Sequence, residues 1–444
     1  MKFSKLFFYG ALITLSSCGV KYSSIIATED NRNQRWVQDI EYFENEFLQK
    51  AKTYTDSAKD SCQIILDKLI REIDDLSDQQ IKLELSRCVV LADNAHTVLP
   101  LGSKHKIPLR FYRFSDGLYV VRSDDSNSKY LGSKILKINS IDIDQLETML
   151  YPYISKIGKA KKVVTIDWII TPNILYHLGI VPDQDSLTIT LLKDGKIEEI
   201  ELGAIEAKND MPWYKNWANL YPDQNPKANW KFIKSNKNKL PLYLKNADQG
   251  VFYTFDENEK LAYFHINSFW NDCPNFKEQV NEFNKKLKIK KDFNVVIDLR
   301  FHTGGDYTYS NKLATEPPKI INDDRKIFLI TSNMTYSAAI VTAARVKYYA
   351  KEKIVIVGEE VGDRLKFWAE SKACVLPNSG TRIYNPMKEH DWKDNKRGLF
   401  RTHFANFLYG VAAMDLNLDE DIKMSFADYQ NNHDPIMEWI IKQK

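Results

Sequence analysis

The chain has 444 residues, about three times the usual length of a domain, so two or three domains and a substantial core are expected. Its 62 basic and 59 acidic residues nearly balance, and it has no long basic block that could follow a phosphate backbone. Composition therefore argues against a nucleic-acid partner.

Residues 1–18 have the layout of a secretion signal. Lys2 and Lys5 precede an apolar run from Leu6 to Leu15, which is too short to span a bilayer. Leu15-Ser16-Ser17-Cys18 resembles the lipobox of bacterial lipoproteins, in which the cysteine is lipidated and becomes the first mature residue. We expect an exported protein anchored at Cys18 in the bacterial cell envelope, on the periplasmic face or at the outer membrane. The alternative is an ordinary cleaved signal with a chance cysteine.

Residues 19–105 are predicted to form a helical region. Between Asn31 and about Ala92, apolar residues recur every three or four positions, as they do in amphipathic helices. The region ends with the turn formers Asp93 and Asn94, and His96 stands just before an extended run.

The cysteines do not indicate a metal site. No pair among them has the close spacing of a zinc knuckle or a redox motif. Cys62 and Cys88 are candidates for a disulfide, because an exported protein meets an oxidising environment.

Residues 106–205 show short strands separated by turns, and they end in a hairpin whose strands flank Asp194-Gly195. A small β-rich domain of this order resembles a PDZ-like module, which binds extended peptides by adding a strand to a sheet edge. The usual Gly-Leu-Gly-Phe type loop is absent, and Gly132-Ser133-Lys134-Ile135 matches only part of the pattern. Residues 206–250 are polar and lack a sustained period, so they are predicted to be a connecting segment.

From residue 251 to 444, strands and helices alternate, as in an α/β or α+β core. Leu261–Ile266 and Asn294–Leu299 are predicted strands, with a helix at Asn275–Leu287 between them. The glycine pair Gly304-Gly305 follows the second strand, and it allows a tight turn that presents backbone N–H groups to a ligand. A phosphate cradle needs more glycines and a lysine, so no nucleotide or other cofactor is expected.

The most informative stretch runs from Lys326 to Glu360. A buried strand at Ile327–Ile330 meets a polar turn, a small-residue helix opens at Ser337, and another strand follows at Ile354–Val357. A serine there lies beside free backbone N–H groups and the positive end of the helix dipole, which suits an acyl-transfer nucleophile. Serine is also a preferred N-cap residue, so a purely structural role is the competing interpretation.

Several separated pieces together resemble the tail-specific, or C-terminal processing, serine peptidases. The core pieces are Asn294–Arg300 with Gly304-Gly305, Thr335-Tyr336-Ser337-Ala338-Ala339, and Val357-Gly358-Glu359. Asp419–Trp439 resembles the last strand and helix of that family, and Asp93-Asn94-Ala95-His96-Thr97 resembles the Asp-x-x-His-Thr segment of its tricorn-core-like branch. The resemblance spans most of residues 35–444. It implies an α/β (α+β) peptidase core of the tail-specific protease type behind the helical region and the PDZ-like module.

The resemblance also implies roles for individual residues. Ser337 becomes the nucleophile, and Gly304, Gly305 and the N–H of Ala338 become the oxyanion-hole region. In the better-known branch the base is a lysine, but Arg364 stands at that position here, and a guanidinium stays protonated. The tricorn-like branch uses a histidine, so His96 is the predicted base.

Alternatives stay open for the base and for the acid that orients it. His302, beside the glycine pair, and Lys366 are the alternative bases. Glu370 is the favoured acid, because an acidic residue after an aromatic one recurs there in the resembling proteins. Glu359 and Glu389 are the alternative acids.

The resemblance implies an exported, lipid-anchored serine-type endopeptidase that acts on extended or unfolded polypeptides through an acyl-enzyme on Ser337. The alternative is a peptide-binding protein that kept this scaffold and lost catalysis, a reading motivated by Arg364 and by the undecided acid. The expected partners are a peptide or unfolded protein and, through the lipid anchor, a membrane. Neither a metal nor a cofactor is expected, and the oligomeric state is not predicted.

Overall fold

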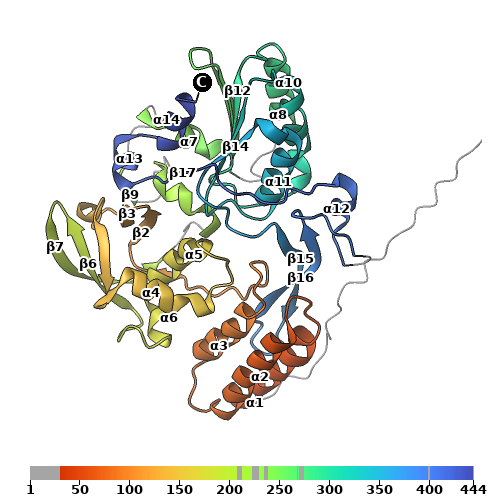
Figure 1. Cartoon of the computed structure of the whole chain (residues 1–444). Helices are drawn as coiled ribbons and strands as arrows, with labels where there is room; N and C mark the ends of the chain where they lie inside the picture. Colours follow the sequence, from red (N-terminus) through yellow and green to blue (C-terminus); the bar gives the residue numbers. More distant parts are fainter. Residues whose placement is uncertain are drawn as a thin grey trace, which may run out of the picture.

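The computed structural model describes residues 31–207, 213–222, 230–234, 239–267, 269, 275–398 and 401–443. The signal segment and the lipidation site predicted at Cys18 lie outside these residues. The described chain has a mixed α/β architecture. Figure 1 shows three parts: a sheet with helices at the upper right, a β-rich part at the left, and a group of helices at the bottom.

The core is a six-stranded sheet of order β10-β11-β12-β13-β14-β17. Strand β10 runs antiparallel to β11, and every other neighbouring pair is parallel. The strands are β10 Val251–Asp256, β11 Leu261–Ile266, β12 Asn294–Asp298, β13 Ile327–Thr331, β14 Ile354–Gly358 and β17 Glu420–Asp421. All residues of β12 and β13 are buried, as expected for parallel strands with both faces covered.

Helices cover both faces of this sheet. In β12, Val295 and Ile297 pack with residues of α8 and α11, whereas the intervening Val296 packs with residues of α14. Successive strand side chains point to opposite faces, so α8 and α11 lie on one side and α14 lies on the other. The helices of this part are α8 Phe276–Leu287, α9 Asn311–Thr315, α10 Pro317–Ile320, α11 Ala338–Ala350, α12 Phe404–Tyr409, α13 Phe426–Asn431 and α14 Pro435–Ile441, with short turns η7 Tyr307–Ser310 and η8 Lys351–Lys353.

The carboxyl ends of three parallel strands bring distant loops together. The loops after β12, β13 and β14 carry Gly304-Gly305, Ser337 and Asp363, respectively. Ligands of open α/β sheets bind at this edge, beyond the carboxyl ends of the strands.

The β-rich part is an antiparallel sheet of order β2-β3-β4-β6-β7, with β5 on β4 and β9 on β3. The predicted hairpin turn has φ of 48° at Asp194 and 75° at Gly195, the left-handed pair that a type I′ turn requires. Part of the predicted connecting segment supplies β9 to this sheet. The elements are β1 His105–Lys106, β2 Leu109–Phe114, β3 Gly117–Asp124, η2 Ser128–Tyr130, β4 Lys134–Ile138, β5 Ile141–Asp142, α4 Ile143–Leu150, η3 Tyr151–Tyr153, α5 Ala160–Ile169, α6 Pro172–His177, β6 Ser186–Lys193, β7 Lys196–Gly203, β8 Ile205–Glu206, η4 Trp213–Leu220, β9 Trp230–Phe232, α7 Leu242–Lys245 and η6 Ala247–Gln249.

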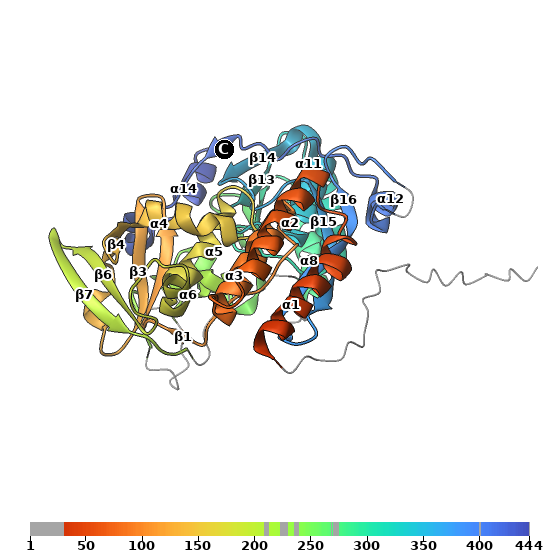
Figure 2. The ribbon, with the colours of Figure 1, turned by 90° about the horizontal axis from the view of Figure 1, so that it is seen from below.

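The helical part and the core are joined by a long ribbon. Its strands are β15 (Lys366–Val375) and β16 (Arg382–Asp391), which reach from the core to the N-terminal helices. Figures 1 and 2 show this ribbon beside the N-terminal helices. The buried carboxylate of Asp39 accepts the N–H groups of Asn378 and Ser379 at the ribbon tip, both at 2.8 Å. The N-terminal elements are α1 Arg32–Tyr42, η1 Phe43–Leu48, α2 Asp56–Arg71 and α3 Asp78–Val90.

Cys62 and Cys88 are neighbours in the core of these helices, but they do not form the disulfide considered from sequence. Both are free thiols, and Cys88 Sγ lies 3.6 Å from the carbonyl oxygen of Cys62. Within the described ranges, no helix combines the length and the apolar composition needed to cross a bilayer.

Candidate active site

Ser337 does not act as an ordinary helix cap. It stands at the N-cap position of α11 with φ 57° and ψ −118°, and its hydroxyl makes no capping hydrogen bond. An N-cap serine normally has extended backbone angles and accepts an N–H of the first turn. Here Ser337 Oγ lies 3.1 Å from Nε2 of His96, a residue 241 positions away in the sequence. The strained backbone therefore aims the hydroxyl at an imidazole rather than at the helix.

The glycine pair lies against this serine. A Cβ at Gly304 would come within 3.2 Å of Ser337 Cβ, and one at Gly305 would come within 2.5 Å of the carbonyl carbon of Phe269. Both glycines have left-handed φ, at 133° and 120°. Only glycine fits this close approach without strain, so the pair brings the loop after β12 to the serine.

Two backbone amides beside Ser337 have unused donors. Among the hydrogen bonds of the described residues, none is donated by the N–H of Gly305 or of Ala338. The N–H of Gly304 differs from them, because it donates to Nδ1 of His302 at 3.3 Å. Gly305 and Ala338 thus match the predicted oxyanion-hole donors better than Gly304 does.

Hydrogen bonds and an ion pair hold the segment that carries His96 against the loop after β14 and the start of β15. Asn94 and Trp368 exchange two hydrogen bonds, with lengths of 3.2 and 3.0 Å. Arg364 pairs with the carboxylate of Asp93 at 2.8 Å. A guanidinium at this position therefore anchors the histidine segment.

The His96 ring lies in a sandwich of two aromatic rings. Tyr336 stacks on it with centroids 4.7 Å apart, and Phe367 stacks on its other side at 5.3 Å. Burial lowers the pKa of His96 well below 6.5, and the nearby Lys156 and His390 lower it further. The imidazole is therefore neutral at pH 7, with an Nε2 lone pair facing the serine hydroxyl.

Asp363 is the carboxylate that faces the second nitrogen of His96. Its Oδ2 lies 3.8 Å from Nδ1, and neither atom has a hydrogen-bond partner among the residues that the structure describes. This distance is too long for a hydrogen bond and too short for an intervening water, so contact requires an approach of about 1 Å. Catalytic hydrogen bonds are often long in the absence of substrate. Burial raises the pKa of Asp363 to about 6.

A buried lysine from the β-rich part also reaches this site. The Lys156 ammonium lies 3.8 Å from the centroid of the Tyr336 ring and donates to the carbonyl of Ala95 at 3.3 Å. Tyr336 Oη donates to the same carbonyl at 3.0 Å. Burial lowers the pKa of Lys156 to about 7, while Asp363 acts in the opposite direction.

The other candidates from sequence lie elsewhere. His302 is fully buried with its ring edge against Phe269, and Lys366 is half exposed with its Nζ 3.4 Å from Glu389. Glu359 lies 3.5 Å from the amide of Asn333, in a different pocket. None of these side chains has a hydrogen bond or ion pair with Ser337 or His96 among the described contacts.

Glu370, the favoured acid, pairs with two other histidines. Its Oε1 lies 3.4 Å from Nε2 of His390 and 3.7 Å from Nε2 of His403. The geometry therefore puts Asp363, and not Glu370, opposite His96. The sequence analysis did not identify Asp363. The signal in the sequence was the glycine before it: a Cβ at Gly362 would lie 2.4 Å from the carbonyl oxygen of Asn333, so this glycine allows the Asp363 loop to approach the loop that carries Ser337.

Hydrogen bonds at Nδ1 decide where His390 and His403 carry their protons. Trp392 Nε1 donates to Nδ1 of His390 at 3.3 Å, and the N–H of Ala405 donates to Nδ1 of His403 at 3.2 Å. An indole and a backbone amide can only donate, so both Nδ1 atoms are acceptors. The N–H of each ring is therefore at Nε2, the nitrogen nearer to Glu370.

This arrangement does not suit a divalent metal. The cluster offers three ligand atoms within 4.8 Å of one another. A metal would bind the Nε2 lone pairs and would move the protons to Nδ1, where the donors of Trp392 and Ala405 already point. The two histidines instead present N–H groups to the carboxylate.

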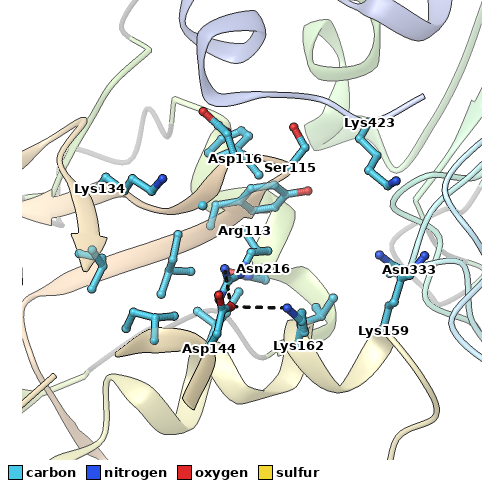
Figure 3. A pocket seen from close by; sticks show the side chains of 18 of the residues that line it. Arg113, Ser115, Asp116, Lys134, Asp144, Lys159, Lys162, Asn216, Asn333 and Lys423 are labelled. Atoms are coloured by element: carbon cyan, nitrogen blue, oxygen red, sulfur yellow. Dashed lines mark ion pairs between the residues drawn. The ribbon is translucent and has the colours of Figure 1, made fainter. Parts of the chain in front are cut away.

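Ser337, His96 and the Glu370 cluster line one cavity of about 860 Å³. A second cavity of about 570 Å³ lies between the β-rich part and the core. Figure 3 shows Asp144 in this second cavity with ion pairs to Arg113 and Lys162, and shows Lys423 and Asn333 on the core side. The first cavity contains the reactive constellation.

The predicted mixed α/β fold is confirmed. Among solved structures, the chain is similar to mature CPAF complexed with lactacystin, with a TM-score of 0.59 and 11% identity over 93% of this chain and 98% of that one. A structure of mature CPAF aligns with a TM-score of 0.54 and 11% identity over 93% and 96%. The photosystem II D1 C-terminal processing protease aligns with a TM-score of 0.35 and 11% identity over 80% and 86%, which establishes no shared fold. No protein-family model and no curated protein matches the sequence.

Proposed function

We propose that this protein is a serine-type peptidase that hydrolyses peptide bonds through an acyl-enzyme on Ser337. The observation that carries the proposal is the 3.1 Å contact between Ser337 Oγ and His96 Nε2, beside two unused backbone N–H groups. A nucleophile, a base within hydrogen-bond reach and donors for an oxyanion are the parts that acyl transfer requires.

In the first half of the reaction, His96 Nε2 takes the hydroxyl proton while Ser337 Oγ bonds to the carbonyl carbon of the substrate. The carbonyl oxygen becomes an oxyanion, which the N–H groups of Gly305 and Ala338 stabilise. The imidazolium then gives its proton to the leaving amine as the C–N bond breaks. In the second half a water repeats these steps, so that the acid is released and Ser337 regains its proton.

Asp363 stabilises the imidazolium in this scheme. When His96 becomes positive, its Nδ1–H is drawn to the Asp363 carboxylate, and the 3.8 Å gap closes to a hydrogen bond. The use of histidine as base agrees with the tricorn-core-like resemblance of Asp93-Asn94-Ala95-His96-Thr97.

The proposed substrate is an extended or unfolded polypeptide, and the proposed location is the bacterial cell envelope with a lipid anchor at Cys18. The location rests on the lipobox-like sequence at residues 15–18. The substrate class rests on the PDZ-like character of the β-rich part, which would hold extended chain.

A fluorophosphonate probe tests the chemistry. It should label Ser337, and the label should be absent from Ser337→Ala and unchanged in Ser57→Ala, which removes an exposed hydroxyl from α2. Folded protein that takes no label would contradict the proposal and favour the alternative, a peptide-binding protein without turnover. In that case the wild type and Ser337→Ala would bind peptides equally well and cleave none.

A further inference from the structure

The cavity of Ser337 has a negative character. Among the described residues, its lining includes the carboxylates of Glu370 and Asp306 and no lysine or arginine. The remaining wall is largely apolar and aromatic, formed among others by Val341, Phe367 and Phe404. A cavity with an apolar wall and a few charged groups binds a side chain that has an apolar stem and a charged head.

Glu370 holds a strained backbone conformation in this wall. Its φ is 57°, although the pairing of β15 with β16 continues on both sides of it, from Ala369 with Lys388 to Ser371 with Pro386. A glutamate with positive φ is uncommon, and such strain persists where the surroundings fix it, often at ligand-binding sites. The strain here turns the carboxylate toward His390 and His403.

The two histidines act on one oxygen of Glu370 only. The Nε2 atoms of His390 and His403 lie 3.4 and 3.7 Å from Oε1, and Oε2 has no hydrogen bond or ion pair within the described part of the chain. The Glu370 side chain is 47% exposed and lines the cavity. The nearby His390 ring is the main cause that lowers the pKa of Glu370, which is therefore ionised at neutral pH.

A row of stacked rings connects this carboxylate to the base. The His96 ring stacks on Phe367, Phe367 stacks on His390 at 5.0 Å, and His390 stacks on His403 at 4.5 Å. The row holds Glu370 at a set position relative to His96 and Ser337, on the wall of the same cavity. A preorganised anion at a set position beside a nucleophile can select which substrate residue enters.

We propose that Glu370 is a specificity-determining residue, which binds the cationic side chain of a lysine or arginine that adjoins the scissile bond of a polypeptide substrate. The aliphatic stem of that side chain packs on the apolar wall, its charged head meets Oε2 of Glu370, and the rings of Tyr307 and Phe404 flank the head. This inference rests on the proposed peptidase function, and it adds the substrate class.

The test compares two peptidyl phosphonates that differ only in the residue attached to phosphorus, arginine in one and leucine in the other. The wild type should react with the arginine probe at least about tenfold faster, the factor expected for a hydrogen-bonded charge pair. Glu370→Gln keeps the shape and removes the charge, so the ratio of the two rates should fall close to one. Asp323→Asn, which neutralises an exposed carboxylate outside the lining of this cavity, should keep the wild-type ratio.

A generic fluorophosphonate, run in parallel, separates the two proposals and reports on folding. Labelling of wild type and Glu370→Gln at equal rates shows an intact nucleophile in both. If the wild type takes this label but reacts equally with the arginine and leucine probes, or if Glu370→Gln keeps the preference, the inference on Glu370 is overturned and the peptidase proposal stands. If no probe labels Ser337, the peptidase proposal fails, and the inference on Glu370, which depends on it, fails as well.

Benzamidine supplies a measurement that needs no new substrate. As a cation without a scissile bond, it should slow generic labelling of the wild type and should have no effect on Glu370→Gln. Equal slowing of the two proteins would contradict a cation site at Glu370.

Discussion

Two neighbouring clusters each combine histidine with an acidic residue, and they have different chemistry. In the first, His96 lies between Ser337 and Asp363. In the second, His390 and His403 face Glu370. Each cluster pairs imidazole with carboxylate, and stacked rings join them. The two clusters differ in the groups that lie next to the Nδ1 atoms of their histidines.

A neutral imidazole carries one proton, so the group at one nitrogen decides what the other can do. No described residue donates to Nδ1 of His96, which lies near a carboxylate, so its proton stays there and Nε2 can accept a proton. Donors from Trp392 and Ala405 reach Nδ1 of His390 and His403 and leave their protons on Nε2. One cluster therefore contains a base, and the other contains donors that hold an anion.

The largest expected effect comes from breaking the first cluster. Ser337→Ala and His96→Gln should each lower kcat by about 10⁴-fold to 10⁶-fold, and the double variant should be no worse than either, because the two residues act as a unit. Peptide turnover of the three variants would check this. Additive losses would mean that His96 does not act through Ser337.

Asp363→Asn should lower kcat by about 10²-fold to 10⁴-fold, because the amide cannot stabilise the imidazolium. The pH profile gives a second readout. Protonation of Asp363, whose pKa burial raises to about 6, removes the negative charge, whereas the pKa of His96 is well below 6.5. We therefore expect kcat/KM of the wild type to fall as the pH drops through about 6. If kcat/KM of Asp363→Asn still falls as the pH drops through about 6, another group causes that fall.

The second cluster should respond differently. His403→Gln removes one of the two ring N–H groups that face Glu370, so the carboxylate loses part of its support. We expect the preference for arginine over leucine probes to fall about threefold, within the range of one modest hydrogen bond. Generic labelling of Ser337 should not change. A large loss of generic labelling would show that His403 supports His96 rather than Glu370.

The smallest effect should follow Lys366→Met. The Lys366 ammonium is half exposed and lies against Glu389, away from both clusters. A change at such a surface site should leave turnover within about twofold. A loss as large as that of His96→Gln would instead make Lys366 the base.

Much of the fold could be predicted from local pattern. The strand predicted at Leu261–Ile266 has those bounds, and the helix predicted to open at Ser337 begins one residue later. Apolar periodicity and glycine placement report on backbone conformation within a few residues, which is why these elements were accessible. The sequence left open whether Cys62 and Cys88 form a disulfide, because spacing does not report whether two thiols are oxidised, and in the structure both are free.

The site was predictable only in part. The motifs around His96 and Ser337 suggested a pair that the fold places in contact. Local sequence could not separate Asp363 from Glu370, since the choice depends on how the loop after β14 and the strand β15 are placed around one ring.

The sequence by itself determined the order of strands and helices, the glycine pair and the serine at the head of α11, because each depends on interactions between near neighbours in the chain. The tertiary structure alone decided which carboxylate faces which imidazole, and on which nitrogen each ring carries its proton. Those outcomes depend on single donors and acceptors brought together from distant segments, such as Trp392 beside His390 and Asp363 beside His96.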